Sequence, residues 1–193
     1  MNRKLFIVDP QNGFMDDGTL PVEGSHARME ALGKYLDSLS LDYYDHITVS
    51  LDWHPLTHCS FAEQGGTWPQ HCVAFTEDAL VTPEVMQPLL RWMKADKVDF
   101  ITKGRDKDTE EYSALDNDAN AESIRSTQAD TDALDVCGVV GTVCVQNTLK
   151  GLLHRGAITP ERIFVLQAYT AQFDEAGEES FLSWVRNEGM NVK

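Results

Sequence analysis

The sequence lacks any apolar run that approaches the roughly 20 residues needed to cross a bilayer, and it has no internal repeat, low-complexity tract or linker. Basic residues are also few, because 16 Lys and Arg stand against 31 Asp and Glu, for a formal net charge of -15. A surface of that sign repels nucleic-acid phosphates. We therefore expect no nucleic-acid partner and no membrane partner, and a small-molecule ligand fits the composition better.

Cysteine is scarce too, with four in 193 residues. In a secreted protein these could form two disulfides. The N-terminal apolar run is broken at Asp9 and Pro10, which is not typical of a secretory signal, so we expect a cytoplasmic protein with free thiols. The length and the 42% apolar content favour one domain over residues 1–193. The oligomeric state is left open, a homo-oligomer included.

Short β-rich apolar runs alternate with segments of helical periodicity, a pattern typical of crossover units that build a parallel sheet. We predict an α/β fold of three layers, α/β/α, with a central, mostly parallel, six-stranded sheet. The predicted strands are 5–8, 46–51, 98–102, 134–140, 162–166 and 190–192. Apolar stripes at helical spacing include Met29, Leu32, Leu36 and Leu39, then Val145, Leu149 and Leu152. Residues 52–82 and 106–118 are predicted loops.

Three chemically active side chains follow predicted strands. Asp9 comes directly after the first strand, Lys103 after the third, and Cys144 shortly after the fourth, at the start of a predicted helix. In open parallel sheets, ligands bind beyond the carboxyl ends of the strands. A thiol is a weak nucleophile until it loses its proton, and an ammonium and a helix N-terminus both favour the thiolate, while a carboxylate can accept the proton. These residues are therefore candidates for nucleophilic catalysis.

The predicted loop 52–82 carries a candidate metal site. Asp52 and His54 are two residues apart, so in extended backbone their side chains point the same way and can reach one ion. His71 adds a second imidazole, and His58 is either a further ligand or a residue behind the ligands. One carboxylate and two imidazoles suit a divalent metal with open positions for water or substrate. Zinc is our first expectation, and the same set also suits iron and manganese.

At this point the sequence resembles the nicotinamidases, a branch of the isochorismatase-like cysteine hydrolases. The resemblance is carried by five segments that span nearly the whole chain: VDPQNGF at 8–14, DWHPLTHCSF at 52–61, TWPQHC at 67–72, TKGRDKDTEEYSALD at 102–116 and GVVGTVCVQNT at 138–148. The metal loop is the most specific of them. The chain departs from many relatives at 140–145, where it reads VGTVCV and they read A-T-D-Y-C-V.

The resemblance implies an isochorismatase-like fold and the hydrolysis of nicotinamide to nicotinate and ammonia through a thioester, in NAD salvage. It implies a catalytic triad of Asp9, Lys103 and Cys144 and a metal bound by Asp52, His54 and His71. It further implies a substrate pocket lined by Phe14, Trp68 and Tyr112, an oxyanion hole made by the backbone N–H groups of Val140 and Cys144, and a cis peptide bond between Val140 and Gly141.

Two other functions stay open from the sequence. One is another isochorismatase-like amidase, acting on a carbamoyl or ureido acid. Such relatives generally lack the metal loop, so Asp52, His54 and His71 argue against it. The other is a non-catalytic metal- or ligand-binding relative, in which loss of Asp9, Lys103 or Cys144 would be expected. All three residues are present.

Overall fold

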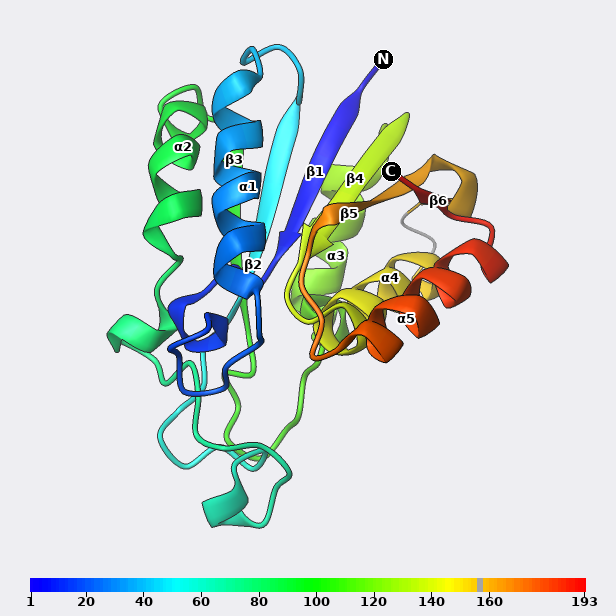
Figure 1. Cartoon of the computed structure of the whole chain (residues 1–193). Coiled ribbons are helices and arrows are strands. Elements are labelled where there is room, and N and C mark those ends of the chain that lie inside the picture. Colours follow the sequence, from blue (N-terminus) through cyan, green and yellow to red (C-terminus); the bar gives the residue numbers. More distant parts are fainter. Residues whose placement is uncertain (156–157) are drawn as a thin grey trace.

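The computed structural model describes residues 1–155 and 158–193. Its centre is a six-stranded sheet in the order β3-β2-β1-β4-β5-β6, in which all paired strands run parallel (Figure 1). The strands are β1 (Arg3–Val8), β2 (His46–Asp52), β3 (Val98–Lys103), β4 (Ala133–Gly138), β5 (Ile163–Thr170) and β6 (Asn191–Val192). The predicted six-stranded α/β sheet is confirmed.

Among the described residues, five α-helices cover the two faces of this sheet (Figure 1). They are α1 (Ser25–Ser38), α2 (Pro83–Met93), α3 (Asp118–Gln128), α4 (Gln146–His154) and α5 (Glu175–Asn187). Successive residues of β1 point to opposite faces: Leu5 and Ile7 pack with residues of α1 and α2, while Phe6 and Val8 pack with residues of α3, α4 and α5. The apolar run 5–8 of β1 is therefore explained by burial on both sides, as the three-layer prediction requires.

Strand β5 runs to Thr170, past its predicted end at 166, and three further elements differ from the prediction. Helix α2 was missed because Pro83 begins it and Pro88 lies inside it, and proline usually interrupts a helical pattern. Helix α3 was missed because it buries few apolar side chains, chiefly Ala121 and Ile124. Strand β4 ends at Gly138 instead of 140, since the chain leaves the sheet there for the π-helical turn Gly141–Val145.

The order of the strands places a switch point between β1 and β4. From β1 the chain builds outward through β2 and β3, then returns to pair β4 with the other edge of β1. Ligands in such sheets bind beyond the carboxyl ends of the strands at this point. The loop between β2 and α2 extends past that end of the sheet (Figure 1). None of the described helices is long and apolar enough to cross a membrane.

Candidate active site

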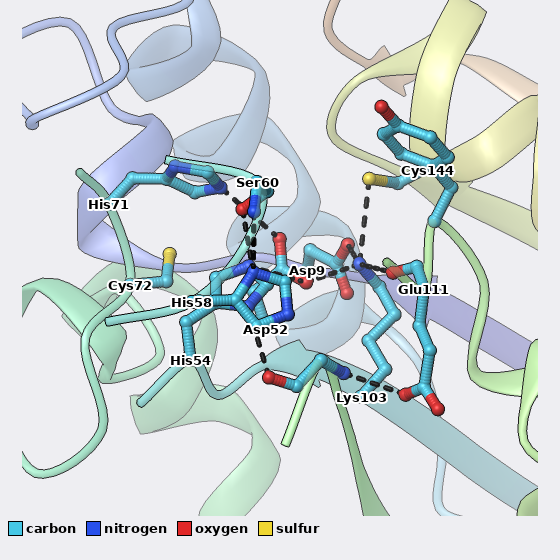
Figure 2. Close-up of polar contacts among 12 residues, drawn as sticks. Asp9, Asp52, His54, His58, Ser60, His71, Cys72, Lys103, Glu111 and Cys144 are labelled. Atoms are coloured by element: carbon cyan, nitrogen blue, oxygen red, sulfur yellow. Dashed lines mark hydrogen bonds and ion pairs between the residues drawn. The ribbon is translucent and has the colours of Figure 1, made fainter. Parts of the chain in front are cut away.

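Four reactive side chains converge at the carboxyl ends of β1 to β4. Asp9 follows β1 directly, and Asp52 and Lys103 are the last residues of β2 and β3. Cys144 lies in the π-helical turn Gly141–Val145, which directly precedes α4. The sequence had placed Cys144 at the start of the helix itself. All four are buried. The structure thus brings the three catalytic candidates together beside the first metal candidate (Figure 2).

The ammonium of Lys103 lies between the other three groups (Figure 2). Its Nζ is 3.0 Å from Asp9 Oδ2 and 3.6 Å from Cys144 Sγ, and it also donates to Asp52 Oδ1. The residue is 1% exposed, so these partners replace the water that an ammonium otherwise needs. A buried ion without them would cost several kcal/mol.

The ion pairs keep Lys103 and Asp52 charged. Burial by itself lowers the pKa of Lys103, but the carboxylates of Asp52 and Asp9 outweigh burial and hold that pKa well above its ordinary value. Burial by itself raises the pKa of Asp52, but Lys103 and then His54 outweigh it and hold that pKa below its usual range. Each charge therefore depends on the other.

The same burial keeps the proton on Cys144. Desolvation raises the pKa of the Cys144 thiol well above its ordinary value, and Lys103 opposes this without reversing it. Lys103 favours the thiolate, as the sequence led us to expect, but desolvation outweighs its effect on the Cys144 pKa. A base must therefore remove the proton before the sulfur can attack.

Asp9 has the properties of that base. Burial raises the pKa of Asp9, although Lys103 and a hydrogen bond from Ser50 lower it. The Ser50 hydroxyl donates to Oδ1 at 2.7 Å. Oδ2 lies 3.0 Å from the Lys103 ammonium, and a carboxylate oxygen of Asp9 lies within 4.8 Å of the Cys144 sulfur, so the thiol proton has a short path to this carboxylate. Asp9 has a φ of 49°, an uncommon backbone conformation for a residue other than glycine.

The turn that carries the thiol differs from expectation in one detail. The cis peptide bond joins Val139 and Val140, one residue earlier than the bond between Val140 and Gly141 that the resemblance implied. This agrees with the early end of β4 at Gly138, because the chain has left the sheet before Val140. Val140 and Cys144, the two expected oxyanion donors, both lie at this turn.

Asp52, His54 and His71 form a buried cluster whose ligand atoms lie within 4.8 Å of one another. His54 Nε2 is 3.5 Å from Asp52 Oδ1, and His71 Nε2 is 3.8 Å from Asp52 Oδ2. Two atoms that each bind one zinc ion at about 2.1 Å can be at most about 4.2 Å apart, and both distances satisfy this limit. The cluster can therefore hold a divalent metal ion.

The second nitrogen of each imidazole fixes its orientation. Nδ1 of His54 is 3.1 Å from the carbonyl of Gly104, and Nδ1 of His71 is 2.7 Å from the carbonyl of Pro69. A carbonyl can only accept, so each Nδ1 carries the proton and each Nε2 keeps its lone pair for the metal. Gly104 has a φ of 67°, and a Cβ there would lie 2.3 Å from the His54 ring, so this close support requires glycine.

His58 has a hydrogen-bond partner at each ring nitrogen. Its Nδ1 accepts from the Ser60 hydroxyl at 2.7 Å, and its Nε2 donates to the carbonyl of Thr109 at 3.0 Å. The ring packs on His54 with centroids 4.2 Å apart. Both nitrogens have partners among the described residues, which favours His58 as a residue behind the ligands over a further ligand.

Sequence reasoning missed Gln11, which holds the strand end beneath the metal cluster. Its Nε2 donates to the carbonyl of Asp52 at 2.7 Å, and its Oε1 accepts from the N–H of Asp52 at 2.8 Å. Ser50 was missed as well, and a polar residue within a buried strand is a signal that could have identified it. Both residues orient a carboxylate of the site.

A pocket opens directly onto Cys144, Lys103 and the metal cluster. The three aromatic residues expected there all line it: Phe14, Trp68 and Tyr112. Trp68 Nε1 donates to the Tyr112 hydroxyl at 3.2 Å. Phe173 was not predicted, yet it lines the pocket and stacks on Trp68, with ring centroids 6.2 Å apart.

Two acidic residues of the predicted surface loop 106–118 also face this site. Glu110 lines the pocket, and burial raises its pKa. Glu111 accepts from the N–H of Gly104 at 2.8 Å, and its carbonyl lies 3.5 Å from Lys103 Nζ. Acidic runs are usually solvated, so the sequence did not predict that Glu110 and Glu111 would lie at the site.

Comparison with known proteins agrees with this geometry, although no family model matches the chain. The nicotinamidase/pyrazinamidase of Mycobacterium tuberculosis is 30% identical over 163 residues, which is 81% of this chain and 82% of that protein. The nicotinamidase of Escherichia coli is 28% identical over 173 residues, 80% of this chain and 78% of that protein.

The fold agrees equally well with a solved structure. The crystal structure of the pyrazinamidase of Pyrococcus horikoshii in complex with zinc matches with a TM-score of 0.83 and 26% identity, covering 100% of this chain and 99% of that one. The identity to the mycobacterial protein extends over more than two thirds of both sequences. From this identity it follows that the chain belongs to the nicotinamidase family.

Proposed function

We propose that this chain hydrolyses nicotinamide to nicotinate and ammonia, with Cys144 as the nucleophile, and that the product enters NAD salvage. The observation that carries the proposal is the buried ammonium of Lys103, 3.6 Å from the sulfur and 3.0 Å from the Asp9 carboxylate. The neighbouring metal cluster and the aromatic pocket support it. So do the mycobacterial and E. coli relatives, which are nicotinamidases.

In the first half of the reaction, Asp9 accepts the thiol proton as the Cys144 sulfur attacks the carboxamide carbon. The new S–C bond moves the carbonyl π pair onto oxygen. Lys103 stabilises the negative charge on sulfur during the transfer. When the carbonyl forms again, the C–N bond breaks, and Asp9 returns its proton to the leaving nitrogen. Ammonia departs and a thioester remains on Cys144.

The oxyanion formed during this attack needs hydrogen-bond donors in the turn around Cys144. The backbone N–H groups of Val140 and Cys144 are our candidates. A donor of this kind typically contributes about 3 kcal/mol to the transition state. The pair lies in a buried part of the pocket, where such contacts are stronger than in water.

In the second half of the reaction, Asp9 is again a carboxylate and takes a proton from water. The resulting hydroxide attacks the thioester carbon, the C–S bond breaks, and the proton held by Asp9 returns to the sulfur. The carboxylic acid product gives up its proton to water and leaves the pocket as nicotinate. The raised pKa of Asp9 suits it to both steps, because a base with a higher pKa accepts these protons more readily.

Asp52, His54 and His71 would hold the metal, and zinc is our proposal because a carboxylate and two imidazoles match its preferred ligands. When bound, a divalent ion supplies a Lewis acid that orients the pyridine ring. Phe14, Trp68 and Tyr112 provide flat apolar walls for that ring. Together these groups direct the carboxamide toward Cys144.

Replacing Cys144 with Ala tests the proposed activity. We expect ammonia release from nicotinamide to fall by about 10⁴-fold or more, because no other group can form the acyl intermediate, while nicotinamide binding by calorimetry persists. Cys137→Ala is the matched control, since Cys137 is buried on the α1 side of the sheet, and it should keep its activity. A wild-type protein that releases no ammonia, or a Cys144→Ala variant that still does, contradicts the proposal.

The ligand assignment is tested by comparing His71→Ala with His58→Ala. We expect metal affinity to fall by more than about 100-fold in the first variant and to stay within a few-fold of wild type in the second, because both nitrogens of His58 are occupied. Metal per chain is measured by elemental analysis after dialysis against a chelator. Equal loss from both variants would show that His58 is a ligand.

Ser50→Ala tests the role of Asp9 through pH. The Ser50 hydroxyl favours the charged carboxylate, so its removal should raise the pKa of Asp9 further. Because the base form is required, the acid limb of the kcat/KM profile should move to higher pH. Ser38→Ala, an exposed site on α1, is the control and should not move it. An acid limb that stays in place in Ser50→Ala argues against Asp9 as the base.

A further inference from the structure

Gln172 is a buried amide two residues beyond the end of β5, behind the turn that carries Cys144. It is 8% exposed. Its Oε1 accepts a hydrogen bond from the backbone N–H of Thr142 at 3.0 Å. Among the described residues, its Nε2 is buried and has no hydrogen-bond partner. A buried unpaired amide costs free energy, so this position of the side chain calls for an explanation.

The turn itself uses two of its N–H groups internally. Both Val143 and Val145 donate to the carbonyl of Val140, at 3.0 and 3.1 Å. These two bonds share one acceptor, which winds the backbone tightly around Val140. They do not connect the turn to the sheet, so they cannot by themselves decide how it faces the pocket.

The end of β5 provides that connection through two further bonds. Gly141 donates to the carbonyl of Ala171 at 2.9 Å, and Thr142 donates to the Gln172 side chain. Ala171 in turn donates to the carbonyl of Gly138 at the end of β4, at 3.0 Å. The turn is therefore held to the sheet at two consecutive residues, one by backbone and one by the Gln172 amide.

The N–H groups of Val140 and Cys144 take no part in the bonds that Gly141, Thr142, Val143 and Val145 make. Outside the turn's own backbone, no described acceptor pairs with the N–H of Val140 or of Cys144. These are the two groups proposed above as oxyanion donors. Transition-state stabilisation requires donors that are oriented in advance, and the Gln172 bond is one of those that fix the turn carrying these two N–H groups.

Gly141 provides the space that the amide occupies. A Cβ built at Gly141 would lie 1.6 Å from Gln172 Nε2 and 2.4 Å from its Cδ. Any larger residue at 141 would therefore have to move the carboxamide away from Thr142. Glycine at 141 and glutamine at 172 form one unit, in which the first makes room for the second.

We infer that Gln172 is a positioning residue for the nucleophile turn, which it fixes through Thr142 so that the N–H groups of Val140 and Cys144 face the reacting carbonyl. This inference rests on the proposed amide hydrolysis. Gln172 touches no reacting atom. Its effect is expected on the transition state and not on the bound substrate, because only the transition state carries the oxyanion.

The test replaces the amide by a side chain of similar length that cannot accept the Thr142 N–H, in Gln172→Met. Losing one oxyanion donor outright costs about 10² to 10³ in kcat, and a displaced donor should cost about tenfold to 100-fold. The KM for nicotinamide should stay within about twofold. Nicotinaldehyde, which adds the thiol to give a tetrahedral adduct without a leaving group, should bind weaker by the factor lost in kcat/KM. Gln172→Glu keeps an acceptor oxygen and should restore part of kcat.

Gln167→Met is the matched control, because Gln167 lies on β5, just before Gln172 in the chain, and its side chain bonds Glu178, away from the turn. This variant should leave kcat, the KM for nicotinamide and the affinity for nicotinaldehyde unchanged. Gly141→Ala is an independent route to the same defect, since the added methyl displaces the carboxamide. The double variant Gly141→Ala, Gln172→Met should lose little more than either single change, and Gly141→Ala alone decides the question should Gln172→Met fail to fold.

Two results would overturn the inference while the proposed function stands. One is an active wild type in which Gln172→Met and Gly141→Ala both keep kcat within about threefold. The other is a loss of kcat that comes with unchanged nicotinaldehyde affinity, or with an equal loss in Gln167→Met, which would indicate a structural role only. A wild type without ammonia release would overturn both proposals, so the two failures are distinguishable.

Discussion

The site depends on one buried ammonium and the groups that balance its charge. Lys103 is almost without solvent, and it remains charged because Asp52 and Asp9 lie against it. In return it keeps Asp52 ionised and ready to accept a metal, and it lies next to the Cys144 sulfur. Catalytic groups and metal ligands are therefore one electrostatic unit, because removing the ammonium would leave two buried carboxylates that repel each other.

The topology explains why this unit forms at this place. Parallel strands end on the same edge of the sheet, so residues that are far apart in the chain, at positions 9, 52 and 103, become neighbours. The switch point between β1 and β4 then places Cys144 opposite Asp9. Residues behind these groups, such as Gln11 and Gln172, hold the strand ends and the nucleophile turn in place.

Much of this could be predicted from the sequence because it follows from periodicity and position. The alternation of strand-like and helical segments predicted the parallel sheet. The positions of Asp9, Lys103 and Cys144 after predicted strands identified them as catalytic candidates, and in the structure Lys103 contacts both of the others. Helix α2 was hidden by its two prolines. Glu110, Phe173 and Gln172 were missed because their contacts cross long distances in the chain and have no local pattern. The sequence indicated that Lys103 favours the thiolate, which it does, but it did not indicate how strongly burial opposes this, because desolvation depends on how many atoms surround the sulfur.

The most direct test of the account is to trap the acyl enzyme. The protein is mixed with nicotinamide, quenched with acid during turnover, digested and examined by mass spectrometry. The account predicts a nicotinoyl group on the peptide that carries Cys144, formed and lost at rates that match turnover. Ammonia release at the normal rate with no acyl group on that cysteine, or with the group on Cys59, Cys72 or Cys137, would contradict it.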